Sequence, residues 1–236
     1  MSGRAFIEIA GARLLPTPEG ALYWPEEETL ILADLHFEKG SSFAARGVLL
    51  PPYDTRTTLG RIEALCERLA PVRIISLGDA FHDGEAEARM DEEDADRLDA
   101  LIAEREWVWV LGNHDPAPPK RFAGEVCAAK RAGPLVFRHE PARGPAPGEI
   151  AGHLHPCARV RTESRIQRLR CFAGDGARLV LPAFGAYTGG LNVLDEAFGG
   201  IFEAAPVTWV LGKRRVYPIA PQLLAADPPS AAALSA

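Results

Sequence analysis

All six histidines of the chain lie at or just beyond the end of an apolar run, beside aspartate, asparagine, glycine or another histidine. Asp34 and His36 form the first such pair, two positions apart in an extended stretch. Alternate residues of an extended segment face the same side, so this carboxylate and this imidazole are directed at one point. His153 and His155 repeat the spacing with two imidazoles. Both pairs offer the donor atoms of a metal site.

Three further blocks place polar donors after apolar runs. Gly78 precedes Asp79, and a glycine there lets the backbone turn sharply and bring the carboxylate close to its target. Asn113 and His114 follow the next run, and His139 ends the one after it. Each block alone is also compatible with an ordinary turn. Their occurrence in one order, each after a predicted strand, favours a shared site.

The candidate ligands supply oxygen and nitrogen donors and no thiolate. They are Asp34, His36, Asp79, Asn113, His139, His153 and His155. Seven ligands are too many for one tetrahedral ion and suit two ions that share a carboxylate. Such a donor set is compatible with Mn²⁺, Fe or Zn²⁺, and a need for more than four ligands per ion favours Mn²⁺. We therefore expect two divalent cations, with Mn²⁺ as the best fit.

The elements that must position these residues follow from hydrophobic periodicity. Strands rich in β-branched residues are predicted at 29–33, 72–77, 107–111 and 134–137. Helices are predicted at 53–69 and 91–105, where apolar residues recur at helical spacing. Shorter strands are predicted at 157–162, 167–173, 177–181, 207–211 and 214–217. Alternating strands and helices followed by paired strands predict a layered α/β sandwich of two sheets.

Length and composition fit one globular domain. The chain has 236 residues, with 32 acidic against 26 basic side chains and a formal charge of −6. We expect one domain over 1–224 and a flexible tail rich in Ala, Pro and Ser over 225–236. No apolar run approaches the ~18 residues of a membrane span, and the N-terminus lacks the pattern of a signal peptide. These features predict a cytoplasmic protein without membrane contact.

The order of the polar blocks resembles that of the calcineurin-like metallophosphoesterase superfamily, over roughly residues 28–160. A finer likeness extends to about residue 195 and rests on four stretches. These are Asp34 to Gly40, Leu49 to Thr55, Gly78 to Asp83 and Leu181 to Gly190. They are similar to the bacterial ligase-associated DNA damage response endonucleases, the PdeM group.

The resemblance implies a four-layer α/β/β/α sandwich, in which two mixed β-sheets are flanked by helices. The ligands that it implies for the first ion are Asp34, His36, Asp79 and His155. Those that it implies for the second ion are Asp79, Asn113, His139 and His153. Asp79 would therefore bridge the two ions.

The resemblance also implies an activity, a DNA endonuclease of DNA repair that cleaves single-stranded DNA. The nucleophile would be a hydroxide that bridges the two ions. His114, outside the ligand set, would act as the general acid that protonates the leaving oxygen. His82 stands where protein phosphatases of the superfamily have an arginine-bearing segment, so we expect it to contact phosphate or support a ligand. Functional association with an ATP-dependent DNA ligase, a nuclease and a helicase is implied as well.

Contacts to the substrate are less clearly indicated. Lys39, Arg46 and Tyr187 are candidates, the two cations for a phosphate backbone and the ring for a flipped-out base. Five arginines follow the histidine pair, namely Arg159, Arg161, Arg165, Arg168 and Arg170. They could clamp a polyanion or simply form the solvated face of antiparallel strands.

Two other functions remain open at the level of sequence. The same site could hydrolyse a small nucleotide diester or a phosphomonoester. Alternatively, the metal site could be structural, in a repair scaffold that binds partner proteins. The second alternative fits poorly with His114, because structural metal sites are normally coordinatively closed.

Overall fold

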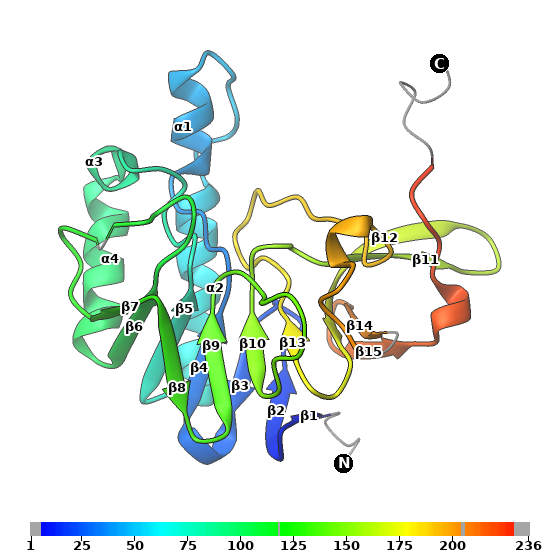
Figure 1. The fold of residues 1–236 in the computed structure, drawn as a ribbon. Helices are drawn as coiled ribbons and strands as arrows, with labels where there is room; N and C mark the ends of the chain where they lie inside the picture. Colours follow the sequence, from blue (N-terminus) through cyan, green and yellow to red (C-terminus); the bar gives the residue numbers. More distant parts are fainter. Residues whose placement is uncertain (1–5, 118, 204–205, 229–236) are drawn as a thin grey trace.

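The computed structural model describes residues 6–117, 119–203 and 206–228. Two β-sheets pack face to face, and the two longest α-helices of the described residues cover the outer face of the first sheet (Figure 1). The first sheet contains β1 (Ile7–Ile9), β2 (Ala12–Pro16), β3 (Leu22–Trp24), β4 (Thr29–Leu32), β5 (Arg73–Leu77), β6 (Glu106–Val110) and β7 (Glu125–Cys127) in that spatial order. Strands β4 to β7 are parallel, and β1 to β4 pair in antiparallel fashion.

The central strands of this sheet are buried on both faces. All four residues of β4, and four of the five in both β5 and β6, are buried. Parallel strands covered on both sides read as continuous apolar runs, which is the pattern that made them visible in the sequence. The predictions of strands at 29–33, 72–77 and 107–111 are confirmed to within one residue at each end.

The described residues form four α-helices. They are α1 (Lys39–Ala45), α2 (Asp54–Leu69), α3 (Ala86–Arg89) and α4 (Glu92–Ala103). Helix α2 buries Leu59, Ile62 and Leu65, each three positions from the next, against the sheet. Helix α4 begins after Asp91, whose carboxylate accepts a hydrogen bond from Glu93 N. The two helices predicted from periodicity are therefore confirmed.

The second sheet is also mixed. It contains β8 (Ala129–Ala132), β9 (Leu135–Arg138), β10 (Glu149–Ala151), β11 (Cys157–Arg161), β12 (Ile166–Gly174), β13 (Leu179–Val180), β14 (Val207–Leu211) and β15 (Val216–Ile219). Its spatial order is β15, β14, β12, β13, β10, β9, β8, with β11 paired to β12. Strand β10 runs parallel to β9 and β13, and the remaining pairs are antiparallel.

One of the two large cores lies between the two sheets, where side chains such as Ile75 and Val108 of the first sheet belong to one buried cluster with Phe137 and Phe172 of the second. The α/β sandwich of two mixed sheets is confirmed. On the outer face of the second sheet, however, the described residues that cover it include no α-helix. The segment 191–202, with the 3₁₀-helix η2 (Glu196–Phe198), covers that face instead.

The reason for that difference is local. The strands of this half are joined largely by hairpins, and the segment from Leu181 to Gly200 contains five glycines, which disfavour a long helix. Two more 3₁₀-helices, η1 (Pro25–Glu27) and η3 (Pro221–Leu223), are found at the surface.

The expected tail begins inside the described residues. Ala225 N donates to Arg159 O, and Asp227 pairs with Arg168, with Nη1 and Oδ1 2.8 Å apart. The rest of the expected tail, 229–236, lies outside the described residues. No helix among the described residues is both long and apolar enough to cross a membrane.

The core between the sheets predicts a large difference between two aliphatic positions of one segment. Ile75 is fully buried in β5, whereas Val72 just before it is 50% exposed. We expect Ile75→Ala to lower the free energy of unfolding by about 2–5 kcal/mol and Val72→Ala to change it by less than about 0.5 kcal/mol. Urea denaturation of both variants measures the difference. Equal losses would contradict the assignment of the core.

Candidate metal centre

The candidate ligands come together at one edge of the two sheets. Asp34, Asp79 and Asn113 follow β4, β5 and β6, whose carboxyl ends lie at the same edge because the strands are parallel. His139 follows β9, and His153 follows β10. The loops of both sheets therefore meet at this edge, and all seven residues named from the sequence contribute donor atoms to one connected group.

Asp34, His36 and His155 form the first cluster, with donor atoms within 4.8 Å of one another. His155 Nε2 lies 3.3 Å from Asp34 Oδ1 and 3.4 Å from His36 Nε2. Asp34 is fully buried and accepts the backbone N–H of His153 on both carboxylate oxygens. No lysine or arginine among the described residues forms an ion pair with it.

Asp79, His139 and His153 form the second cluster. His139 Nε2 lies 3.1 Å from His153 Nδ1, 3.4 Å from Asp79 Oδ2 and 2.8 Å from Asn113 Oδ1. Asp79 Oδ2 also lies 3.9 Å from His36 Nε2 of the first cluster. The Asp79 carboxylate is thus the group that lies between the two clusters.

The donor chemistry of His139 fits a cation. Its Nδ1 lies 2.9 Å from the carbonyl oxygen of Leu77, which can only accept, so Nδ1 carries the proton. In the neutral ring Nε2 then carries a lone pair, and it faces Asn113 Oδ1 and the Asp79 carboxylate, which are acceptors too. Acceptors that converge in a buried place repel one another unless a positive charge lies among them. The residues present therefore fit bound divalent ions.

The backbone at the candidate ligands is strained. Asp34, His36, Asp79, His153 and His155 all have φ between 46° and 69°, in the left-handed region that non-glycine residues rarely adopt. Such conformations cost of order 1–3 kcal/mol each and persist where the surroundings impose them. Five of the seven candidate ligands share this feature, which indicates that the fold sets their direction at some cost in stability.

Three glycines make room for the ligands. A Cβ added to Gly78 would lie 2.5 Å from the His139 ring, and one added to Gly152 would lie 2.6 Å from Asp34 Oδ2. A Cβ at Gly112 would lie 2.3 Å from Asp79 Oδ1. Close approach therefore favours glycine at all three positions that precede candidate ligands, and Gly78 also has a positive φ of 71°.

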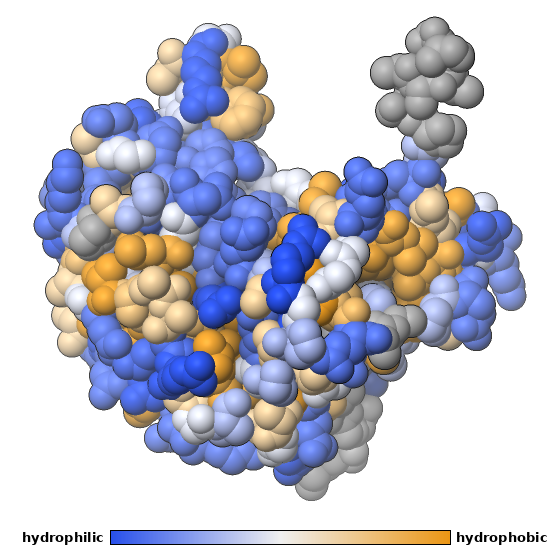
Figure 2. Space-filling view, viewed as in Figure 1, coloured by the Kyte–Doolittle hydropathy of each residue, from blue (hydrophilic) through white to orange (hydrophobic). Residues whose placement is uncertain are grey.

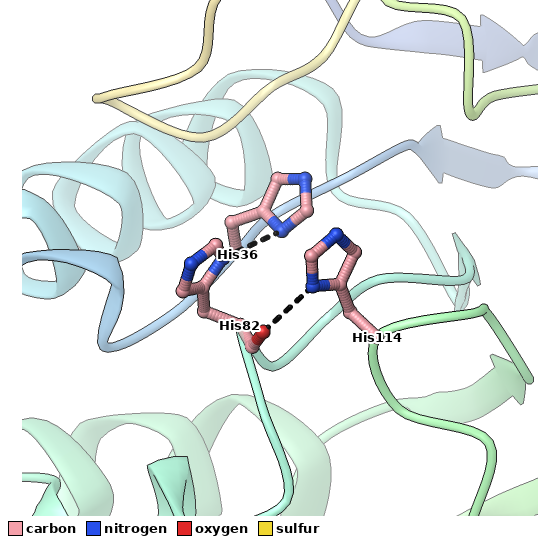
Figure 3. Close-up of side chains that lie close together, drawn as sticks. All are labelled: His36, His82 and His114. Carbon is pink, nitrogen blue, oxygen red and sulfur yellow. Dashed lines mark hydrogen bonds between the residues drawn. The ribbon is translucent and has the colours of Figure 1, made fainter. Parts of the chain in front are cut away.

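His36, His82 and His114 form a third group, which shares His36 with the first cluster. Figure 3 shows the three rings, from three separate segments, directed toward one another. His82 Nδ1 lies 3.4 Å from His36 Nδ1, and the His82 and His114 rings stack with centroids 5.0 Å apart. Burial, as the largest cause, lowers the pKa of His36 to about 2 and that of His82 to about 4. Both are therefore neutral imidazoles at neutral pH.

His114 is exposed and is held from two sides. Its backbone N–H donates to Asp79 Oδ1 at 2.8 Å, and its Nδ1 donates to the carbonyl oxygen of His82 at 2.8 Å (Figure 3). The ring Nε2 has no hydrogen-bond partner among the described residues. The ring is thus oriented beside the two clusters, and its Nε2 is available to a bound molecule.

Asp115 has a positioning role that the sequence did not indicate. Its carboxylate accepts the backbone N–H groups of Asp79, Ala80, Phe81 and Gly112, at 2.7 to 3.1 Å. Burial raises its pKa to about 6, with the neighbouring charge of Asp79 acting in the same direction. Its place after the histidine in the block Gly-Asn-His-Asp was the available signal, but a sequence does not show which backbone groups will surround a carboxylate.

The three predicted substrate contacts are placed differently. Lys39 is half-buried at the start of α1, and its charge helps to depress the pKa of both His36 and His82, so it lies close to the third group. Arg46 is exposed, and its charge is the smallest of the named contributions to the lowered pKa of His82. Tyr187 donates its hydroxyl to Pro51 O and so links two loops. Among the described residues, no hydrogen bond joins Tyr187 to the clusters.

Three of the five arginines of residues 159–170 have contacts on the hairpin side of the second sheet. Arg159 and Arg168 pair with Asp227, and Arg170 donates to Ala183 O. Arg161, Arg165 and Arg168 are exposed. Exposed guanidinium groups suit both a clamp for a polyanion and a solvated face.

The contact between Gly78 and the His139 ring predicts loss of the site without loss of a ligand. We expect Gly78→Ala to lower Mn²⁺ affinity by about 10–100-fold, because the added methyl group displaces the ring. Gly84→Ala is the matched control, since a Cβ at Gly84 meets nothing within 4 Å. Isothermal titration calorimetry with Mn²⁺ measures both. Unchanged affinity in Gly78→Ala would refute the geometry.

The hydrogen bonds of Asp115 predict that a residue outside the candidate ligand set affects Mn²⁺ affinity. Asp115→Ala removes the acceptor of four backbone N–H groups, and we expect Mn²⁺ affinity to fall by about 10–100-fold with all seven candidate ligands still present. Asp115→Asn keeps one acceptor oxygen and should recover part of that loss. If Asp115→Ala binds Mn²⁺ as the unaltered protein does, Asp115 has no role in holding Asp79.

Comparison with known proteins agrees with this geometry. The family model described as calcineurin-like phosphoesterase matches residues 28–176, more than half of the chain. Among solved structures, the nuclease MPE of Pseudomonas putida is 28% identical, with a TM-score of 0.71, over 92% of this chain and 100% of that one. Yfce, a phosphoesterase from E. coli, is 13% identical over 81% of this chain and 98% of that one, and its TM-score of 0.42 supports no further conclusion. No curated protein matches.

The match spans the strands β4 to β12 and every candidate ligand. Binuclear sites built from histidine and aspartate are typical of this family, and the clusters on either side of Asp79 have that composition. The chain belongs to the calcineurin-like phosphoesterase family and is a metal-dependent phosphoesterase.

Proposed function

We propose that this protein is a Mn²⁺-dependent endonuclease that cleaves single-stranded DNA. The proposed ligands of one ion are Asp34, His36, Asp79 and His155, and those of the other are Asp79, Asn113, His139 and His153. The observation that most supports a phosphodiester substrate is the orientation of His114 beside these ligands. Likeness to a nuclease at 28% identity supports DNA as that diester.

Bound divalent ions would supply charge neutralisation at the phosphate and activation of water. The residues of the chain must orient the diester and deliver a proton to the leaving oxygen. An alkoxide of deoxyribose is a poor leaving group, so its departure depends on that proton.

His114 has the geometry for this transfer. In the protonated ring, Nδ1–H stays with the carbonyl oxygen of His82, and Nε2–H is free to donate. After the transfer the neutral ring keeps its Nδ1 proton and its hydrogen bond, so the orientation does not change. The backbone N–H of His114 on Asp79 ties this position to the proposed bridging carboxylate.

His82 and Lys39 would assist from the neighbouring side. His82 is 8% exposed and neutral at neutral pH, so its ring can donate a hydrogen bond to a phosphate oxygen without adding charge. Lys39 adds positive charge near the same group. Arg46 and Tyr187 would contact the strand farther from the reacting phosphate.

A role in DNA repair, beside an ATP-dependent ligase, a nuclease and a helicase, is part of this proposal. Its support is the sequence resemblance over the four stretches between Asp34 and Gly190.

A single-stranded DNA circle tests the function directly. We expect the Mn²⁺-loaded protein to convert the circle to linear and then shorter products, since only internal cleavage opens a circle. Intact circles together with rapid hydrolysis of a cyclic nucleotide or an aryl phosphomonoester would overturn the proposal in favour of a small substrate. Inactivity toward all phosphoesters would contradict the proposal as a whole.

The role of His114 predicts a split between two substrates. We expect His114→Ala to lose about 10²–10⁴-fold in turnover of single-stranded DNA. Hydrolysis of bis(p-nitrophenyl) phosphate should be nearly unchanged, because nitrophenolate leaves without protonation. Mn²⁺ affinity, measured on the same preparation, serves as the control for an intact site. Equal loss on both diesters would rule out the acid role.

A further inference from the structure

A cavity of about 550 Å³ opens directly beside the second cluster. Asn113 and His139 form one of its walls, so the cavity is continuous with the proposed metal centre. Arg138 and Arg143 line the remainder with the loop that follows β9, against one exposed carboxylate, Glu140. Figure 2 shows several of the most hydrophilic side chains of this face near the middle of the view, where Figure 1 places the top of β9 and the loop after it.

The charge of Arg138 is only partly compensated. Its Nε lies 3.4 Å from Glu149 Oε2 and makes no hydrogen bond, and its side chain is 37% exposed. Glu149 is buried and also pairs with Arg178, at 3.2 Å. One carboxylate therefore faces two guanidinium groups, which leaves a net positive charge at the cavity. No hydrogen bond from the terminal nitrogens of Arg138 to a described residue is found.

The walls of the cavity are fixed without help from Arg138. Arg178 donates to the carbonyl oxygens of Ala142 and Gly144, and the Glu149 carboxylate accepts from Ala142 N. These contacts hold the loop in place and keep Glu149 paired. Arg138 is thus a cation beside the reacting centre that the local structure does not need for its own support.

We infer that this cavity binds the nucleotide next to the scissile phosphate of a single-stranded DNA, with Arg138 contacting the neighbouring, non-scissile phosphate. The inference rests on the proposed function and extends it by naming where the DNA strand leaves the proposed metal centre. A guanidinium suits this task because its planar set of donors matches two phosphate oxygens.

The test compares Arg138→Ala on substrates with one phosphate and with several. For an oligodeoxythymidylate we expect kcat/KM to fall roughly 10-fold or more, through KM. For a dinucleoside monophosphate and for bis(p-nitrophenyl) phosphate, which have no second phosphate, we expect no change. The slope of log KM against log salt concentration for the oligonucleotide should decrease by about 0.7, as for one lost contact to a single strand.

Arg131→Ala is the matched control. Arg131 is an exposed arginine of the adjacent strand β8 and does not line the cavity. Its replacement by alanine removes the same charge as Arg138→Ala does. Arg138→Lys should restore part of the oligonucleotide activity, because it retains the charge. Equal effects of Arg131→Ala and Arg138→Ala, or an equal effect of Arg138→Ala on all three substrates, would overturn the inference. If the unaltered protein hydrolyses only the aryl diester, the proposed function is wrong. If the unaltered protein cleaves DNA and Arg138→Ala cleaves it equally well, the proposed function stands and only the inference about Arg138 is wrong.

Discussion

Two buried carboxylates, Asp34 and Asp79, determine what the rest of this structure must provide. Neither forms an ion pair with a lysine or arginine among the described residues. Each accepts a backbone N–H group and lies within 4 Å of two imidazole nitrogens. A buried charge without a partner is costly, and cations between the donors would offset that cost. The left-handed backbone of five candidate ligands and the close approach of three glycines bring the donors together around these two carboxylates.

The fold meets this requirement with the edge at which both sheets end. Parallel strands β4, β5 and β6 bring residues from the first half of the chain to one edge, and β9 and β10 bring histidines from the second half to the same place. Asp115 then connects the loop after β6 to that after β5 through backbone N–H groups. The same edge also forms one wall of the cavity that Arg138 lines. The candidate metal centre and the proposed path of the DNA strand are therefore held by the same edge of the two sheets.

The sequence predicted the parts of the structure that depend on local pattern. The buried parallel strands are continuous apolar runs and the two long helices have strong periodicity. Asp34, Asp79, Asn113 and His139 stand just after predicted strands, whereas His153 and His155 follow β10, which was not predicted. The short strands β1 to β3, β7, β8 and β10, and the short helices α1 and α3, were not predicted, because runs of three to seven residues contain little periodicity. The role of Asp115 and the position of Arg138 depend on contacts between distant segments, which one sequence does not specify.

The central claim is that two divalent ions bind on either side of the Asp79 carboxylate. Titration with Mn²⁺ followed by electron paramagnetic resonance tests it most directly, because two ions that share a ligand are magnetically coupled. The account predicts two Mn²⁺ ions per chain with a coupled spectrum at saturation, and loss of the coupling in Asp79→Asn. A single uncoupled ion at saturation, or a coupled pair that survives Asp79→Asn unchanged, would contradict it.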